Sequence, residues 1–223
     1  MQSHFEKEIS DLKDKLLTMA SHAETSVRRA VEALMNRDEK LVSQVRENED
    51  IIDRFEVQID EVAVHLLSKA PLATDLRLIM VAMKISQNLE RVGDEASKIA
   101  KRTRELIQEA PLKQVARIPS LADMALASLK ASLDAFVKHD PAAARALIPR
   151  DKEIDALNRE IYRDLANQMV EAPETIASGL NLIVVAKSLE RIGDHAKNVA
   201  EEVVFLFEAQ DIRHTAATKV TQP

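Results

Sequence analysis

Apolar residues recur every three or four positions along almost the whole chain, which is the spacing of one face of an α-helix. In the first stretch, for example, Ile9, Leu12, Leu16 and Met19 follow this spacing. No segment shows the strict alternation of apolar and polar residues that is typical of a β-strand. The predicted fold class is therefore all-α. The pattern predicts helices over residues 5–35, 39–70, 74–109, 121–137, 141–172 and 174–209.

The breaks between these helices occur in the same order in both halves of the chain. Asp38 corresponds to Asp140, and Pro71 corresponds to Pro173, both at an offset of 102 residues. Short links between long helices make neighbouring helices run antiparallel. We therefore expect two tandem, sequence-related antiparallel three-helix bundles packed side by side. The expected boundaries are 1–110 for the first bundle, 111–212 for the second and 213–223 for a disordered tail.

Composition agrees with this pattern and excludes several classes of function. Aromatic residues make up 3% of the chain, charged residues 30%, and only three of the 223 residues are glycine, which favours helix throughout. The net charge of −6 argues against non-specific nucleic-acid binding. The absence of cysteine excludes disulfides, thiolate zinc sites and a cysteine nucleophile. No apolar run approaches the ~20 residues of a transmembrane helix, so we expect a cytoplasmic protein.

One short sequence occurs twice, 100 positions apart. It reads LERVGD at 89–94 and LERIGD at 189–194. Each copy places a glutamate and an aspartate four residues apart, as in Glu90 and Asp94, so both side chains lie on the same face of a helix. Each copy also places a glycine, Gly93 or Gly193, inside a helix, at a cost of about 1 kcal/mol relative to alanine. The missing side chain would let the neighbouring helix or a bound ion approach the backbone.

The preceding helix of each half also carries two acidic residues four positions apart. Asp53 lies 18 residues before Pro71 and Glu90 lies 19 residues after it. In an antiparallel pair, equal distances from the turn mean equal height, so the sequence predicts four carboxylates at one level in each half, at or near the surface. The candidate metal ligands are Glu49, Asp53, Glu90 and Asp94 in the first half, and Asp151, Asp155, Glu190 and Asp194 in the second.

Carboxylates gathered in this way favour a bound cation. Two like charges 4 Å apart repel by about 1 kcal/mol in water and by about 4 kcal/mol at an effective dielectric constant near 20. Ligation by oxygen alone favours Mg²⁺, Mn²⁺, Ca²⁺ or iron, as divalent or trivalent ions, over zinc or copper. The alternative is a solvated acidic face that pairs with Arg91, Arg191 or Lys98.

Other candidate residues are weaker. On a helical wheel His195 points away from the acidic stripe, whereas Asn198 could add a carbonyl ligand in the second half only. The chain has no Ser-His-Asp set, no glycine-rich phosphate loop and no Glu-x-x-His pair of the di-iron bundle type. Nothing in the sequence therefore indicates an enzyme.

Three stretches closely resemble the PhoU family of bacterial phosphate-specific transport. They are DLR at 75–77, LERVGDEASKIAK at 89–101 and LERIGDHAKNVAEEV at 189–203, and the resemblance extends over about residues 5–208. It implies two three-helix bundles with metal clusters on the eight acidic residues named above. The family pattern differs between the two halves at Ser97-Lys98 and Lys197-Asn198, so the two metal sites would be chemically unequal.

The resemblance also implies a function. A PhoU-like protein would be a negative regulator of the phosphate-starvation response and of phosphate uptake. It would act as a metal-binding helical adaptor between the ATPase subunit of a phosphate ABC transporter and a phosphate sensor histidine kinase. We expect a homodimer that does not bind nucleic acid. The alternatives are an oxygen-ligated metal-binding or metal-storage bundle and a metal-free structural oligomerisation protein.

Overall fold

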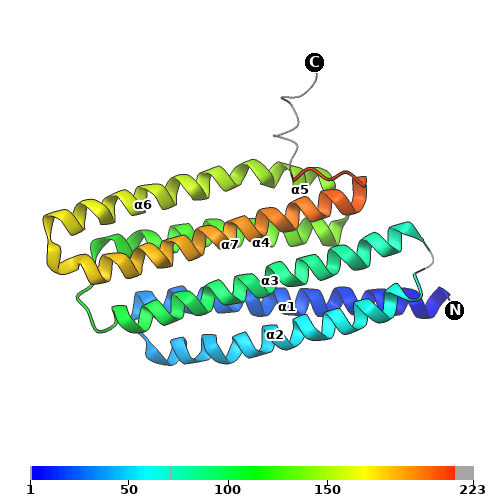
Figure 1. The fold of residues 1–223 in the computed structure, drawn as a ribbon, viewed down its shortest axis with the longest axis horizontal. Coiled ribbons are helices and arrows are strands. Elements are labelled where there is room, and N and C mark those ends of the chain that lie inside the picture. Colours follow the sequence, from blue (N-terminus) through cyan, green and yellow to red (C-terminus); the bar gives the residue numbers. More distant parts are fainter. Residues whose placement is uncertain (1, 71, 214–223) are drawn as a thin grey trace, which may run out of the picture.

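The computed structural model describes residues 2–70 and 72–213, and these residues form helices and short connections without a β-strand. The all-α fold class is therefore confirmed. The long helices run along the long axis of the molecule, with α1–α3 in one half and α4–α7 in the other (Figure 1). No helix in the described ranges combines the length and apolar character that crossing a bilayer requires. The tail that we expected from residue 213 lies, apart from Arg213, outside the described residues.

The first three long helices form an antiparallel unit. They are α1 (Gln2–Asn36), α2 (Glu39–Leu67) and α3 (Ala73–Leu106). The turn between α1 and α2 contains Arg37 with a φ of 55°, and the N–H of Asp38 donates to the carbonyl of Ala33 at 3.0 Å. The carboxylate of Asp38 accepts from the N–H of Lys40 at 2.8 Å, so Asp38 is the N-cap of α2.

The second unit repeats this arrangement. It comprises η1 (Lys113–Arg117), α4 (Ile118–Lys138), α5 (Pro141–Leu147), η2 (Ile148–Arg150), α6 (Asp151–Glu171), η3 (Pro173–Thr175) and α7 (Ile176–Glu208). His139, with a φ of 57°, takes the place of Arg37, and the Asp140 carboxylate accepts from the N–H of Ala143 at 2.9 Å. The same pair of devices, a left-handed residue followed by an aspartate cap, thus reverses the chain in both repeats.

The prediction of one continuous helix over 141–172 is wrong. The chain forms α5, then the short 3₁₀ turn η2, then α6, and Pro149 lies in the turn. A proline has no N–H to donate and its ring clashes with the carbonyl four residues earlier, so an α-helix breaks there. The break makes Asp151 the first residue of α6, where the helix dipole stabilises a carboxylate.

The buried apolar residues of both units form one cluster. Leu89 and Val92 of α3 and Leu189 and Ile192 of α7 are all fully buried within it. The helices α3 and α7 lie side by side along the middle of the molecule (Figure 1). The expected side-by-side packing is therefore confirmed, whereas the boundary between residues 110 and 111 stays a prediction.

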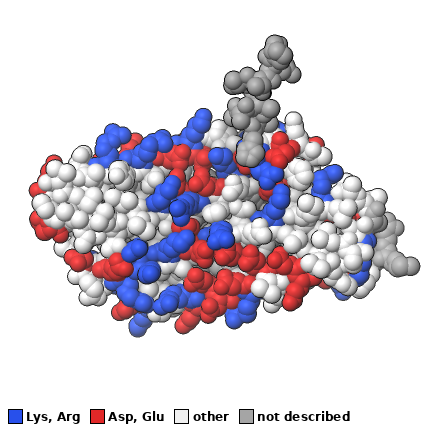
Figure 2. Space-filling model, in the orientation of Figure 1, with Lys and Arg blue, Asp and Glu red and all other residues white. Residues whose placement is uncertain are grey.

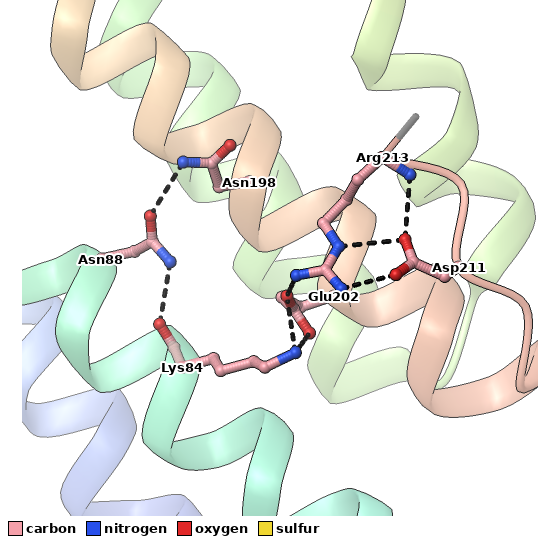
Figure 3. A network of polar contacts seen from close by, with 6 residues as sticks. All are labelled: Lys84, Asn88, Asn198, Glu202, Asp211 and Arg213. Atoms are coloured by element: carbon pink, nitrogen blue, oxygen red, sulfur yellow. Dashed lines mark hydrogen bonds and ion pairs between the residues drawn. The ribbon is translucent and has the colours of Figure 1, made fainter. Parts of the chain in front are cut away.

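A polar network crosses the α3–α7 seam next to the apolar contacts. The buried Glu202 of α7 accepts from the Lys84 ammonium of α3 at 3.0 and 3.1 Å, and from Arg213 at 3.4 Å (Figure 3). One turn along, the amide of Asn198 donates to the Asn88 carbonyl oxygen at 3.2 Å. Because Arg213 follows α7, the end of the described chain folds back onto the contact between the two repeats.

A second buried carboxylate, which belongs to the first repeat, also forms polar contacts across the seam. Glu95 of α3 accepts from Lys98 at 2.9 Å on its own helix and from Arg191 of α7 at 3.3 Å. Burial acts to raise the pKa of Glu95, but hydrogen bonds from Lys98, Ser188 and Arg191 hold it below its ordinary value. The seam therefore carries paired charges as well as apolar packing.

The repeated glycines mark the closest approach between neighbouring helices. A Cβ on Gly93 would lie 2.9 Å from Ile52 Cδ1, and one on Gly193 would lie 2.7 Å from Ile154 Cδ1. Both isoleucines are fully buried, and neither glycine has a positive φ. The glycines therefore serve close packing and not backbone freedom, as the sequence predicted.

We expect Gly193→Ala to destabilise the protein by about 1 kcal/mol. The new methyl group overpacks the contact with Ile154 by roughly 1–3 kcal/mol, and the gain of about 1 kcal/mol in helix propensity offsets only part of this. Thermal unfolding should show a decrease in Tm of about 2–4 °C for a chain of this length.

A double-mutant cycle supplies the control. Ile154→Val removes the Cδ1 atom that the new methyl would meet, so the double variant should be more stable than the sum of the two single effects implies. A Gly193→Ala variant that equals or exceeds the parent in stability would contradict this account.

Candidate metal centres

Three of the four predicted acids of the first repeat come together between α2 and α3. Burial raises the pKa of Asp53, and the neighbouring charge of Asp94 raises it further. Burial also raises the pKa of Glu90, again helped by Asp94 and more weakly by Asp53. The shifts of Asp53 and Glu90 mean that both lie within reach of the charge of Asp94. The three acids therefore lie at one level, as the hairpin predicted.

Sequence reasoning missed one member of this group. Glu56 of α2 is half-buried, and its pKa is raised by burial, then by the charges of Asp60 and Asp53. The available signal was its position three residues after Asp53, on the same helix face. We call Asp53, Glu56, Glu90 and Asp94 the first acidic cluster.

The remaining predicted acid, Glu49, lies one turn before Asp53 on α2. It is half-buried and lines a cleft with Asp94, Ser97 and Lys98 of α3. The structure therefore brings Glu49 beside Asp94, the partner that the hairpin count assigned to it. Asp94 is the residue that the two ends of the acidic stripe share.

All four predicted acids of the second repeat come together between α6 and α7. The pKa of Asp194 rises to about 6, because the side chain is partly buried and because Glu190, Asp151 and Asp155 all add negative charge around it. We call these four residues the second acidic cluster. The expectation that every acid is near the surface is wrong for Glu190, which is only 7% exposed on α7.

Basic side chains pair with several of these carboxylates. In the first cluster, Arg91 lies 3.3 Å from Glu90 and 3.4 Å from Asp94. In the second, ion pairs join Lys197 to Asp151 at 3.0 Å and Lys187 to Glu190 at 2.5 Å. Arg191 and Lys98, which the sequence also offered as partners, instead pair with Glu95 in the seam. Within the described residues, the present side-chain positions bring no three acidic or histidine groups close enough together to bind one metal ion.

The chemistry of the donors nevertheless fits a hard cation. Oxygen Oδ1 of Asp151 is buried without a hydrogen-bond partner, and so is Oδ1 of Asp60 beside the first cluster. A buried acceptor left unpaired costs roughly 1–3 kcal/mol, and a cation would satisfy it. All of the cluster donors are carboxylate oxygens, the ligands that Mg²⁺, Ca²⁺ and Mn²⁺ prefer. For an ion to take up Asp151, Lys197 would have to release it.

His195 and Asn198 lie outside the second cluster. The Nδ1 atom of His195 is 3.0 Å from the Asn88 side-chain oxygen, the same oxygen to which Asn198 donates. Both residues therefore face the α3–α7 seam, and His195 points away from the acidic stripe, as expected. The placement of Asn198 does not support its use as an additional ligand.

Comparison with known proteins gives the same family for both repeats. The family model described as the PhoU domain matches residues 16–103 and again residues 118–203. A Pseudomonas aeruginosa protein named phosphate-specific transport system accessory protein PhoU homolog is 37% identical, over 100% of this chain and 93% of its own length. The phosphate-specific transport system accessory protein PhoU of Escherichia coli is 32% identical, over 99% of this chain and 92% of its own length.

Solved structures support the same grouping. The crystal structure of PhoU from Pseudomonas aeruginosa superposes with a TM-score of 0.89 at 38% identity, and covers 92% of this chain and 100% of that one. The phosphate transport system regulatory protein PhoU of Streptococcus pneumoniae is 23% identical, with a TM-score of 0.86 over 93% of this chain and 99% of that one. At this level of identity, the similarity to the Streptococcus pneumoniae structure supports the fold only.

We expect Asp194→Asn to stabilise the metal-free protein at pH 7.5. A carboxyl group whose pKa is raised in the folded state favours folding below its ordinary pKa near 3.8, and this contribution is lost as the pH rises past about 6. The amide removes that loss, so Tm should rise at pH 7.5, by an amount that corresponds to about 1 kcal/mol because water screens the half-buried group. The difference between variant and parent should shrink at pH 4.5.

Asp123→Asn is the matched control, since Asp123 is exposed on α4 and the substitution changes the net charge equally. A destabilising Asp194→Asn, or an effect that is the same at both pH values, would contradict the electrostatic description of the cluster.

Proposed function

This chain belongs to the PhoU family, and on that basis we propose that it is an accessory protein and negative regulator of a phosphate-specific transport system. The observation that carries the proposal is identity of 32–37% along nearly the whole chain to proteins named as accessory proteins of such a system. The protein would repress the phosphate-starvation response and phosphate uptake when phosphate is plentiful. We assign it no catalytic activity, in keeping with relatives that are named as accessory proteins.

The mechanism that we propose is that of an adaptor. The protein would work in the cytoplasm as a homodimer and connect the ATPase subunit of a phosphate ABC transporter with a phosphate sensor histidine kinase. Helices longer than 20 residues offer rigid faces on which two partners can bind at a fixed separation. The paired helices α2 with α3 and α6 with α7 carry the acidic clusters on such faces.

Metal ions would be bound by Glu49 and by the carboxylates of the two clusters, and would neutralise the repulsion between these groups. The residues that would hold them are Glu49, Asp53, Glu90 and Asp94 in the first repeat, with Glu56 beside them, and Asp151, Asp155, Glu190 and Asp194 in the second. The unpaired Asp151 oxygen and the raised pKa of Asp194 support this assignment. Binding would fix the spacing of each helix pair and change the charge of the face that a partner meets.

A second candidate is a metal-free scaffold, and one observation favours it. Arg91, Lys187 and Lys197 already pair with acids of the clusters. In that case the same faces would bind partners through a mixed-charge surface, without an ion. The measurement of metal binding separates the two candidates.

We expect Mn²⁺ to raise the Tm of chelator-treated protein. A ligand that binds only the folded state stabilises it by about 2.7 kcal/mol at 100 times its Kd. The double variants Glu90→Gln/Asp94→Asn and Glu190→Gln/Asp194→Asn should each lose part of the shift. Asp123→Asn/Glu171→Gln removes the same charge at two exposed positions and should keep all of it. The absence of a shift in the parent protein would favour the metal-free scaffold.

Regulation is tested in cells that lack the gene for this protein and carry a phosphate-repressed reporter. The reporter should be expressed at high phosphate in these cells, and the parent protein should restore repression. We expect a variant with both acidic clusters neutralised to be produced at normal levels but to leave the reporter expressed. Normal repression without the protein would overturn the regulatory proposal, whereas normal repression by the variant would overturn only the role of the clusters.

A further inference from the structure

A cleft of about 360 Å³ opens on the first repeat, between the first part of α2 and the last part of α3. Its volume lies within the range of small-molecule binding sites. The side chains that line it are Val42, Arg46, Glu49, Asp94, Ser97, Lys98, Lys101 and Arg104. Four of these are basic and two are acidic, which leaves a formal excess of two positive charges.

Three of the basic residues form a ladder along α3. Lys98, Lys101 and Arg104 are spaced three residues apart, so their Cα atoms extend over about 9 Å of the helix axis. Arg46 faces them from α2 across the cleft. In Figure 2, Lys and Arg side chains gather at this end of the two helices, and Asp and Glu gather further along them.

These cations are only partly neutralised within the described chain. Lys98 pairs with the buried Glu95 of the seam at 2.9 Å. Arg46 and Lys101 form no ion pair or hydrogen bond with another described residue, and Arg104 reaches only the exposed Glu39, at 3.6 Å. The hydroxyl oxygen of Ser97 is buried in the wall of the cleft without a hydrogen-bond partner. The cleft therefore offers unused donors and positive charges on both of its walls.

The second repeat does not preserve this arrangement. The residues that correspond to Arg46, Lys98, Lys101 and Arg104 are Ile148, Asn198, Glu201 and Val204. Lys197, which corresponds to Ser97, pairs with Asp151, and the hollow beside them measures about 10 Å³. The basic cleft is thus a property of the first repeat and not a consequence of the shared fold.

We propose that this cleft binds a small anion that carries more than one phosphoryl group. Arginine forks and lysine ammonium groups are the side chains that recognise phosphate oxygens. The ladder extends over about 9 Å, which exceeds the reach of a single phosphate group. The unpaired Arg46 and Lys101 supply positive charge from both walls of the cleft. This inference goes beyond the proposed function, since it requires neither a bound metal ion nor a partner protein.

The test is calorimetric titration of pyrophosphate into the full chain, in metal-free buffer at low ionic strength. We expect saturable binding of about one pyrophosphate per chain, weakened at least tenfold by Arg46→Gln/Lys101→Gln. Both side chains are exposed and unpaired in the described structure, so this variant should keep the helical content and Tm of the parent. Circular dichroism checks that it does.

The matched control is Lys130→Gln/Arg163→Gln. Both residues are exposed on the second repeat, form no ion pair or hydrogen bond with another described residue, and carry the same total charge. This variant should bind pyrophosphate within twofold of the parent. Two results would overturn the proposal: no binding by the parent at millimolar pyrophosphate, or equal weakening by both double variants, which would indicate a general effect of net charge.

Discussion

The close contact between a glycine on one helix and an isoleucine on its neighbour is the constraint on which both acidic clusters depend. Ile52 precedes Asp53 and Gly93 precedes Asp94, so the contact that buries the isoleucine also sets the two carboxylates at one level. Burial of an isoleucine side chain stabilises the fold by about 1.5–3 kcal/mol. Repulsion between two partly solvated carboxylates is of comparable magnitude, about 1–4 kcal/mol at 4 Å, and Arg91 offsets part of it. Apolar packing can therefore hold the acids together before any ion binds.

Much of this arrangement could be predicted from the sequence, because it follows from local rules. The helical periodicity and the distances from the interhelical turns predict which residues share a level, and the repeated glycine predicts a close approach. The rules failed where a tertiary contact decides the outcome. Glu190 is buried although its first-repeat counterpart Glu90 is only half-buried, and Glu56 joins its cluster from a position without the repeated motif. The break at Pro149 was predictable from the lack of an N–H, but the strong apolar pattern on both sides of it favoured a single helix.

The two repeats share a backbone but differ in what surrounds their acids. Ser97 leaves a hollow beside Glu49, whereas Lys197 extends to Asp151 and fills the corresponding space. Lys101 corresponds to Glu201, so the charge beyond each cluster has the opposite sign. An ion at the first cluster would lie beside a basic cleft, and one at the second would compete with a lysine. The two repeats therefore share one fold but surround their acidic clusters with chemically different side chains.

The seam between the repeats makes these differences relevant to the whole molecule. Helices α3 and α7 carry the repeated motifs and also provide the central contact between the two units. Glu95 follows Asp94 directly and pairs with Arg191, which follows Glu190, so residues of the acidic clusters adjoin the ion pair that joins the repeats. A change of charge at either cluster therefore acts one residue away from the seam. If the protein acts as the adaptor proposed above, this proximity offers a physical route by which binding at a cluster would alter the relation between the repeats.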